Sequence, residues 1–546
     1  MEAKYFFGID LGTTYSVISY LDENGLIQTC KNDEGSQITP SVVDLSGATP
    51  VVGDVAKDNK VFAPHSVLDH FKREMDQGHA IKYYGEAYDK TTTAIDLSAE
   101  VLKYLARYAS AETDSLVGAV VITVPAYFGT EQKAATKEAA VKAGFDEKDV
   151  FLIEEPTAAA VYYGYKGDKK ETVMVYDLGG GTFDVVAVDI DGYKYDCCVV
   201  DGDVELGGKE WDQCMTDIIT GKLMEKDIDV TSLSDDDLAE IQLAAEKAKK
   251  ALTPSESTNI SLKLEAGKAQ IEVTREEFEA LSMPLLNRTV ERTRAAKEKA
   301  EALGKTITKI LLVGGSSYMP QVRERLTMEF PDVEVPSPMD PNMAVSKGAA
   351  FFGKSILAKY MEAMNSQIGE VSAAGSEGAE EAAAAASAAV AEQFSLGPAT
   401  VSVAENTQFE LSGGVIEIKK VSVSSIGLRG VIGSTPKIMT LLRRGETLPL
   451  TKDIDIPLNA DALRIGRVDL QLYEHRSEEQ FIDMDEPQLK EMEKQTGAIS
   501  TGLPEGSVMH IHLEISDEGL LTLIATDPNG ECIALSAQAE AKSADA

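Results

Sequence analysis

A short motif occurs twice in this chain, once near the N-terminus and once in the middle. Gly8-Ile9-Asp10-Leu11-Gly12-Thr13-Thr14-Tyr15 returns as Val175-Tyr176-Asp177-Leu178-Gly179-Gly180-Gly181-Thr182-Phe183. Each copy is an apolar strand that ends in Asp, followed by Leu-Gly and a turn of small residues. A second apolar strand follows at 17–20 and at 185–188. The pattern predicts two β-hairpins with glycine and threonine at their tips.

The residues at these turns suit a bound phosphate. Outward-pointing backbone N–H groups form a concave site for an anion, and glycine lets the backbone approach it closely. A carboxylate is an acceptor-only, hard ligand that suits Mg²⁺ or its water shell. Because Asp10 and Asp177 stand in register in the two copies, the repeat predicts two lobes that close on one nucleotide from opposite sides.

Composition narrows the class of protein. The chain has 546 residues and 43% hydrophobic content, typical of a soluble globular protein with several domains. Its net charge of -38 disfavours nucleic acid and anionic membranes as partners. Five cysteines, an odd and sparse set, do not predict a disulfide framework. No apolar run has the length of a membrane span, and the N-terminus leads directly into a strand, so we expect a cytoplasmic protein.

Three regions follow one another along the chain. Residues 1–360 alternate short apolar strands with helical segments, which predicts α/β architecture; examples are a strand at 120–125 and a helix at 130–143. Residues 361–414 are rich in alanine, with an unbroken run at Ala382–Ala386, and predict a linker. Residues 415–540 show a period of two, which predicts a small antiparallel β-sandwich with strands that include 464–474 and 508–515.

Two further features belong with the repeated hairpins. Gly314-Gly315-Ser316-Ser317 joins a strand to a helix start, where free N–H groups favour an anion or the polar edge of a ligand. Glu155 follows a strand, as Asp10 and Asp177 do. Buried carboxylates are costly unless they are paired or metal-linked. The three therefore predict a Mg²⁺ site, held mostly through water, beside an attacking water molecule, as phosphoryl transfer requires.

These motifs resemble those of the heat shock protein 70 family, within the actin and sugar-kinase superfamily. The resemblance is strong over residues 5–355 and rests on the two hairpins and on further segments, which are 124–128, 155–160, 206–208 and 312–316. It implies a two-lobed, actin-like ATPase domain that binds ATP or ADP with Mg²⁺, and usually K⁺, in the cleft.

The resemblance also implies roles for individual residues. The residues implied to take part in catalysis are Lys72, Glu155, Asp10, Asp177 and Thr182. Three of them, Asp10, Glu155 and Asp177, are also implied to form the metal shell. Nucleotide binding falls to Gly12, Thr13, Thr14, Tyr15, Gly180, Gly181, Thr182, Gly208, Glu246, Lys249, Lys250, Thr253, Gly314, Gly315, Ser316, Tyr318 and Asn342. Pro125 and Lys133 match an interlobe switch, although the family usually has Arg at the position of Lys133.

The C-terminal region resembles the family's peptide-binding β-domain more distantly. We expect no helical lid, and an alanine-rich tract with 416–420 replaces the family's apolar linker. Tyr318 and Asn342 stand where Arg and Asp are usual. These departures leave ATP hydrolysis intact, because Tyr also stacks on a base, and they predict weak coupling between ATP and peptide.

The sequence thus predicts an ATP-dependent chaperone that binds unfolded or specific polypeptide through a lidless β-domain. A J-domain co-chaperone and a nucleotide exchange factor are the partners that the resemblance implies. Two alternatives stay open: an ATP-binding scaffold without peptide release, and a small-molecule kinase of the same superfamily. The kinase would need a substrate-specific catalytic base, for which no separate motif is found.

Overall fold

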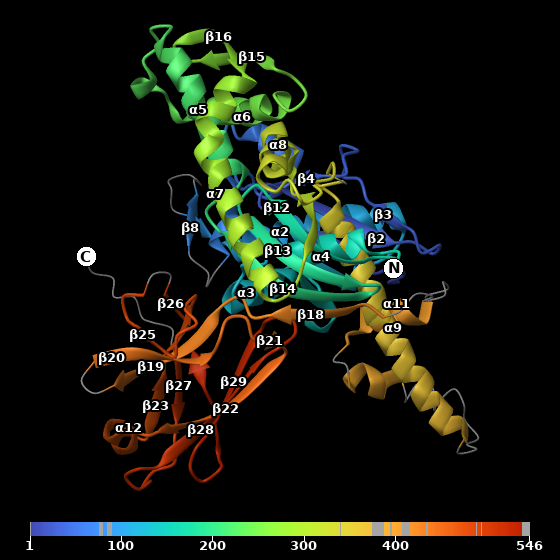
Figure 1. The fold of residues 1–546 in the computed structure, drawn as a ribbon, viewed down its shortest axis with the longest axis vertical. Coiled ribbons are helices and arrows are strands. Elements are labelled where there is room, and N and C mark those ends of the chain that lie inside the picture. Colours follow the sequence, from blue (N-terminus) through green and yellow to red (C-terminus); the bar gives the residue numbers. More distant parts are fainter. Residues whose placement is uncertain are drawn as a thin grey trace. The chain divides into compact units, whose positions relative to one another are not determined.

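The computed structural model describes residues 2–75, 80–83, 90–338, 340–373, 387–393, 396–406, 415–432, 435–486, 489–492 and 494–537. The chain divides into two compact units (Figure 1). The first unit contains Met1–Tyr127 and Ala135–Ile418, and the second contains Phe128–Ala134 and Lys419–Ala546.

Two sheets with the same topology form the centre of the first unit. In the first sheet the order is β11-β10-β1-β2-β3, and in the second it is β17-β12-β13-β14. In each, a hairpin pairs on one side with a later, parallel strand: β1 with β10, and β12 with β17. The strands are β1 (Phe7–Asp10), β2 (Tyr15–Leu21), β3 (Ile27–Thr29), β10 (Val120–Val124), β11 (Val150–Glu154), β12 (Lys170–Leu178), β13 (Phe183–Asp191), β14 (Lys194–Asp203) and β17 (Ile307–Val313). The repeated motif therefore folds into a repeated supersecondary structure.

Smaller sheets extend the first unit. A pair formed by β2 and the short β4 (Thr39–Pro40) continues the first sheet, and three further sheets are separate from it. Their strands are β5 (Val42–Asp44), β6 (Val51–Val52) and β7 (Val67–Asp69); β8 (Ile81–Tyr83) and β9 (Lys90–Thr92); and β15 (Ser257–Leu264) and β16 (Gly267–Thr274). We refer to residues 2–127 with 135–163 as the first lobe and to residues 170–338 as the second lobe.

Helices pack around the two sheets. They are α1 (Asp54–Asn59), α2 (Ala94–Thr113), α4 (Glu155–Tyr163), α5 (Gly208–Met224), α6 (Asp235–Ala251), α7 (Arg275–Ala302), α8 (Pro320–Glu329) and α9 (Ala344–Ala373), and α3 (Thr130–Ala143) includes residues of both units. Figure 1 shows α7 along β13 and β14. At Gly8 of β1 a Cβ atom would lie 2.1 Å from the backbone nitrogen of Ala350, so only glycine allows α9 to pack this closely on the sheet.

Part of the segment predicted as a linker packs in the first unit. Helix α9 continues to Ala373, and α11 (Pro398–Asn406) begins where Asp149 accepts hydrogen bonds from the N–H groups of Ala399 and Thr400, at 3.0 and 2.8 Å. Val390, Leu396 and Val403 are buried in the core of this unit. The compact unit ends at Ile418, whereas the expected domain boundary lay at residue 360. The run Ala382–Ala386 lies outside the described residues.

The second unit is an antiparallel β structure. Two of its sheets have the orders β25-β20-β19-β24-β26 and β22-β28-β29-β30, and a third has the order β23-β27-β31. The strands are β19 (Ser425–Ile432), β20 (Thr435–Leu442), β22 (Leu450–Pro457), β23 (Arg467–Leu470), β24 (Leu472–His475), β25 (Phe481–Asp483), β26 (Lys490–Glu491), β27 (Gln495–Ala498), β28 (Val508–Ile515), β29 (Leu521–Thr526), β30 (Cys532–Ile533) and β31 (Ser536–Ala537), with β18 (Glu417–Val421) paired to β21 (Thr447–Leu448). Alternate residues of the strands fill one apolar core.

One predicted strand, 464–474, is wrong in its first residues and is interrupted at Gln471, where it divides into β23 and β24 of two different sheets. Arg464 lies in α12 (Ala460–Ile465), a short helix with Asn459 as its N-cap. The helix ends at Gly466, whose φ of 68° is left-handed, and the strand starts only at Arg467. A capping residue, Asn459, followed seven positions later by glycine was the local signal for a helix. The predicted fold class is otherwise confirmed: an actin-like α/β ATPase domain followed by an antiparallel β-rich region.

Candidate functional site

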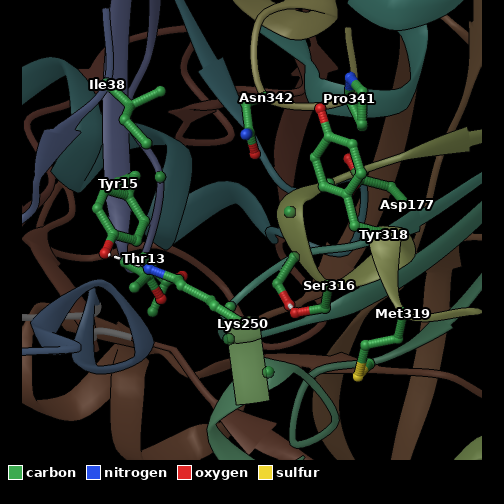
Figure 2. Close-up of a pocket in the computed structure, with 18 of the residues that line it drawn as sticks. Thr13, Tyr15, Ile38, Asp177, Lys250, Ser316, Tyr318, Met319, Pro341 and Asn342 are labelled. Carbon is green, nitrogen blue, oxygen red and sulfur yellow. Dashed lines mark hydrogen bonds between the residues drawn. The ribbon is translucent and has the colours of Figure 1, made fainter. Parts of the chain in front are cut away.

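The tips of the two repeated hairpins lie at one pocket of the first unit, with a volume of about 400 Å³ (Figure 2). All the predicted nucleotide-binding residues line it, together with Asp10, Glu155 and Asp177. Further lining residues that the sequence analysis did not single out are Val17, Ile38, Gly179, Asp212, Pro254, Met319, Pro341 and Val345. The pocket thus brings together residues that lie more than 300 positions apart in the sequence, from Asp10 to Val345.

At the inner end of the pocket the two turns touch each other. A Cβ atom at Gly180 would lie 1.8 Å from Thr14 Oγ1, and one at Gly181 would lie 2.6 Å from Thr13 Oγ1. Larger residues at these two positions would push the lobes apart. The close contact leaves backbone groups of both turns at the pocket wall, an arrangement suited to phosphate.

Lys72 is the one predicted catalytic residue that does not line the pocket. It is buried, with 3% of its side chain exposed, and its Nζ lies 2.6 Å from Glu155 Oε1. The short 3-10 helix Phe71–Glu74 carries it, after His70 with a left-handed φ of 56°. The ion pair places the ammonium group directly behind the lining carboxylate.

Acidic side chains gather around this pair. Burial and the charge of Glu155 raise the pKa of Asp10 to about 7, and burial with the same neighbour raises the pKa of Asp177. Asp184, on β13, is 1% exposed, and burial and Glu155 raise its pKa to about 7 as well. In all three, burial and then repulsion from neighbouring carboxylates disfavour the charged form.

Asp184 was missed in the sequence. It occupies the position in the second hairpin that corresponds to Val17 in the first, since Asp10 pairs with Val17 and Asp177 with Asp184, and it interrupts the apolar run Phe183–Val188. A charged residue inside a buried strand was the available signal. Its carboxylate accepts hydrogen bonds from the N–H of Tyr127 and the hydroxyl of Thr182, at 3.2 and 3.3 Å.

The acidic residues fit a metal held through water. Among the residues that the structure describes, no three His, Cys, Asp or Glu side chains are placed to bind an ion directly. The carboxylates nevertheless carry the charge that a hydrated divalent cation would balance. The donor set therefore fits Mg²⁺ with its water shell.

Arg73 connects the two lobes next to the ion pair of Lys72 and Glu155. Its guanidinium donates to both carboxylate oxygens of Glu210, at 2.8 and 2.7 Å, and to the carbonyl of Gly181. Glu210 lies in the first turn of α5 and also accepts from the N–H of Gly207, at 2.7 Å. A bidentate pair of this kind holds two groups in a defined orientation, so the turn at Gly181 is tied to the segment that carries Lys72.

The outer end of the pocket contains a network around the hydroxyl of Tyr15. Lys250 donates to this hydroxyl at 2.6 Å (Figure 2). Lys57 also donates to it, at 2.8 Å, and Tyr15 donates to Glu246 at 2.9 Å. Lys57 also donates to Glu246 Oε2 at 2.5 Å. Burial opposes the charge of Glu246, but Lys57 and Lys250 hold its pKa below the usual range. Lys57 lies on α1 and was not predicted, because nothing in the local sequence places it near α6.

Helix α6 presents the basic residues of this end. It begins with a capping box in which Ser234 and Asp237 exchange side-chain to backbone hydrogen bonds, at 3.2 and 3.3 Å. Three turns later Lys249 donates to the carbonyl of Gly208 at 3.1 Å and pairs with Asp212 at 2.8 Å. The cap thus fixes where these side chains reach the pocket.

The opposite wall comes from the loop after β17. Ser316 donates to the carbonyl of Gly179 at 3.0 Å, which links this loop to the second hairpin. Figure 2 shows Tyr318 and Pro341 on one side of the pocket and Tyr15 and Ile38 on the other. The Tyr318 side chain is 43% exposed, so its ring is available for stacking on a planar ligand.

Pro125 and Lys133, the predicted switch residues, are both buried; Pro125 directly follows β10, and Lys133 lies in α3. In the part of the chain that the structure describes, every helix is too short or too polar to cross a membrane.

A comparison with protein families finds a match to the Hsp70 protein model over residues 6–82 and 76–373. Hsp70 proteins are generally ATP-dependent chaperones that bind ATP or ADP with Mg²⁺, polypeptide substrates and co-chaperones. The match covers well over half of the chain and includes both repeated hairpins and the loop after β17, so the chain belongs to the Hsp70 family.

Proposed function

We propose that this chain hydrolyses ATP in the pocket between its lobes and binds polypeptide through its second unit. The observation that carries the proposal is the buried pair of Lys72 and Glu155 behind Asp10 and Asp177, at the point where the two glycine turns meet. Positive charge, carboxylates and free backbone N–H groups are the elements that phosphoryl transfer uses.

In this proposal different walls of the pocket bind the phosphates, the sugar and the base of the nucleotide. Thr13, Thr14, Gly180, Gly181 and Thr182 hold the phosphates through backbone and hydroxyl groups. Glu246, Lys249 and Lys250 hold the sugar, and Gly315, Ser316, Tyr318 and Asn342 hold the base; Gly12, Tyr15, Gly208, Thr253 and Gly314 complete the walls. Asp10, Glu155 and Asp177 hold Mg²⁺ mostly through water, and the acidic cluster also suits K⁺. Mg²⁺, when bound, neutralises phosphate charge.

Lys72 and Glu155 carry the chemistry in this proposal. The ammonium group of Lys72 stabilises charge on the terminal phosphate and orients the attacking water. Glu155 and Asp177 accept hydrogen bonds from that water, and Thr182 donates to the phosphate. Burial raises the pKa of Asp177, which makes this carboxylate a stronger proton acceptor.

Polypeptide binding is proposed for the second unit, on the strength of family membership and its antiparallel strands. Strands of this kind supply main-chain hydrogen bonds and side-chain pockets to an extended peptide. Among the described residues of this unit after Lys419, the helix is α12, which is six residues long. Since the described residues of this unit after Lys419 contain no long helix, we expect fast peptide exchange, because affinity differences lie mostly in the off-rate.

Two assays on the full chain test the proposal. The first measures ATP hydrolysis with and without an unfolded peptide and a J-domain protein; stimulation supports a chaperone, and an unstimulated but real ATPase supports the scaffold. The second measures fluorescence anisotropy of a labelled apolar peptide, with a peptide of the same length in which serine replaces the apolar residues as control. Weak, fast-exchanging binding with little response to ATP is expected. A long-lived complex that ATP releases sharply would contradict weak coupling.

A further inference from the structure

Two histidines project from the outer face of a sheet in the second unit. Along β28 the residues Met509, Ile511, Leu513 and Ile515 are buried, whereas His510 and His512 alternate with them on the other face. Their side chains are 56% and 41% exposed. Side chains two positions apart on a strand share a face, with Cα atoms about 6.7 Å apart. The spacing puts two imidazoles within reach of one small ligand.

Each histidine is paired with an aspartate on the neighbouring strand β22. The register places His510 opposite Asp455 and His512 opposite Asp453. His510 Nδ1 lies 2.5 Å from Asp455 Oδ1, and His512 Nδ1 lies 2.8 Å from Asp453 Oδ1. A carboxylate only accepts hydrogen bonds, so in each pair Nδ1 is the donor. In the neutral ring Nε2 is then left with its lone pair.

We propose that His510 and His512 chelate a divalent transition metal of the Zn²⁺ type through Nε2, with Asp453 and Asp455 as the groups that orient the two rings. Metal-bound histidines commonly donate their other ring N–H to a carboxylate, which fixes the tautomer and makes the ligand more basic. Imidazole suits zinc, copper and nickel, whereas Mg²⁺ and Ca²⁺ prefer oxygen ligands. The site is therefore chemically distinct from the Mg²⁺ site proposed in the nucleotide pocket.

The two histidines supply part of the coordination shell, and water supplies the rest. Among the described residues no cluster of three His, Cys, Asp or Glu side chains is arranged around one point, which is consistent with an exposed two-histidine chelate. Glu514 follows on the same face of β28 and adds negative charge near the pair. A chain with a net charge of -38 also favours accumulation of cations at its surface.

Cys532 is the competing ligand that must be excluded. It lies on β30 in the same cross-strand row as His510, with Thr526 of β29 between them. The hydrogen bonds to Asp453 and Asp455 draw both rings toward β22, on the opposite side of β28 from β29 and β30. The geometry therefore favours a site made by the two histidines without the thiol.

Isothermal titration of the full chain with Zn²⁺ tests the proposal, in the presence of excess Mg²⁺ and a non-thiol reductant. We expect one site with a dissociation constant in the micromolar range. His510→Ala and His512→Ala should each weaken Zn²⁺ binding by at least about tenfold. Asp453→Asn and Asp455→Asn should each weaken Zn²⁺ binding by about tenfold or more. The melting temperature of each metal-free variant should equal that of the parent, because these side chains are exposed.

Two matched variants serve as controls. His65→Ala removes another histidine that pairs with an aspartate, Asp235, outside the sheet that carries His510 and His512. Cys532→Ser removes the thiol in the same sheet. Both should bind Zn²⁺ as the parent does. The absence of a saturable site, unchanged binding in both histidine variants, or loss of binding in Cys532→Ser would each overturn the proposal. Unchanged binding in both aspartate variants would overturn their role as orienting groups.

Discussion

The two ends of the pocket proposed to bind nucleotide differ in how their buried carboxylates are balanced by positive charge. At the inner end Asp10, Asp177 and Asp184 surround Glu155 and its partner Lys72, and the pKa of each of these three aspartates is raised. At the outer end Glu246 lies between Lys57 and Lys250, and its pKa is lowered. The inner end thus carries negative charge that the protein does not neutralise, whereas the outer end is already balanced.

The difference indicates that the two ends of the pocket have different roles. An uncompensated acidic cluster lowers the stability of the empty protein, and such conflicts with local stability are expected at functional sites. A balanced network costs less and joins α1 of the first lobe to α6 of the second. We therefore expect changes at the inner end to alter chemistry and stability, and changes at the outer end to alter nucleotide exchange.

The largest effect should come from Lys72→Ala. Loss of the ammonium group removes the positive charge beside the reacting phosphate, and such groups contribute about 10²–10³ in rate. ATP binding should change little, because Lys72 does not line the pocket. Single-turnover hydrolysis checks the rate and equilibrium titration checks binding, with the exposed Lys226→Ala as control. An unchanged single-turnover rate would remove Lys72 from the catalytic residues.

Asp177→Asn should reduce Mg²⁺-dependent hydrolysis by about 10–100-fold. An amide lacks the negative charge that orients metal-bound water, and groups of this kind are worth roughly that factor. The measurement is the Mg²⁺ dependence of the ATPase rate. Asp191→Asn, at the far end of β13 and paired with Lys170, is the control. Superimposable Mg²⁺ titrations of parent and Asp177→Asn would show that Asp177 is outside the metal shell.

Asp184→Asn should stabilise the nucleotide-free protein at about pH 8. Burial raises the pKa of Asp184 to about 7, so its contribution to stability is complete below its usual value and is lost as the pH rises through 7. Asparagine stays neutral; its Oδ1 can accept from the N–H of Tyr127, and its Nδ2 can donate to the hydroxyl oxygen of Thr182. We expect a gain of about 1–3 kcal/mol at about pH 8 that vanishes near pH 4.

Thermal unfolding in EDTA at several pH values measures this gain, with the exposed Asp58→Asn as control. A variant that is less stable than the parent at alkaline pH would show that the inner end is not electrostatically strained.

The smallest effect should come from Lys57→Ala. Its ion pair with Glu246 is largely shielded from solvent, with 18% and 14% of the two side chains exposed. Loss of the link between the lobes should speed nucleotide release by about 3–10-fold, equivalent to roughly 1 kcal/mol, without changing single-turnover hydrolysis. Stopped-flow release of a fluorescent ADP analogue measures the rate. Lys60→Ala, at the C-cap of the same helix but paired with Asp69 inside the first lobe, should release ADP like the parent.

Much of the fold followed from local sequence. The hairpins at Asp10 and Asp177 were predicted because an apolar strand, a glycine turn and a second strand are local patterns. The helix at 130–143 has the predicted type and the predicted bounds. Arg464 shows the limit of periodicity, since its apolar neighbours suited a strand while the Asn459 cap started a helix.

The sequence by itself determined the residue types at the phosphate turns, because only glycine and small hydroxyl residues fit where the two hairpins meet. It also determined the two-lobed architecture, because the duplicated motif folds the same way in each half. Tertiary structure alone decided which distant charges meet. Lys57 reaches Glu246 across 189 positions, and Asp184 joins the acidic cluster from the interior of a strand. Long-range electrostatics depends on distance in space and on burial, and neither quantity is written in the order of the residues.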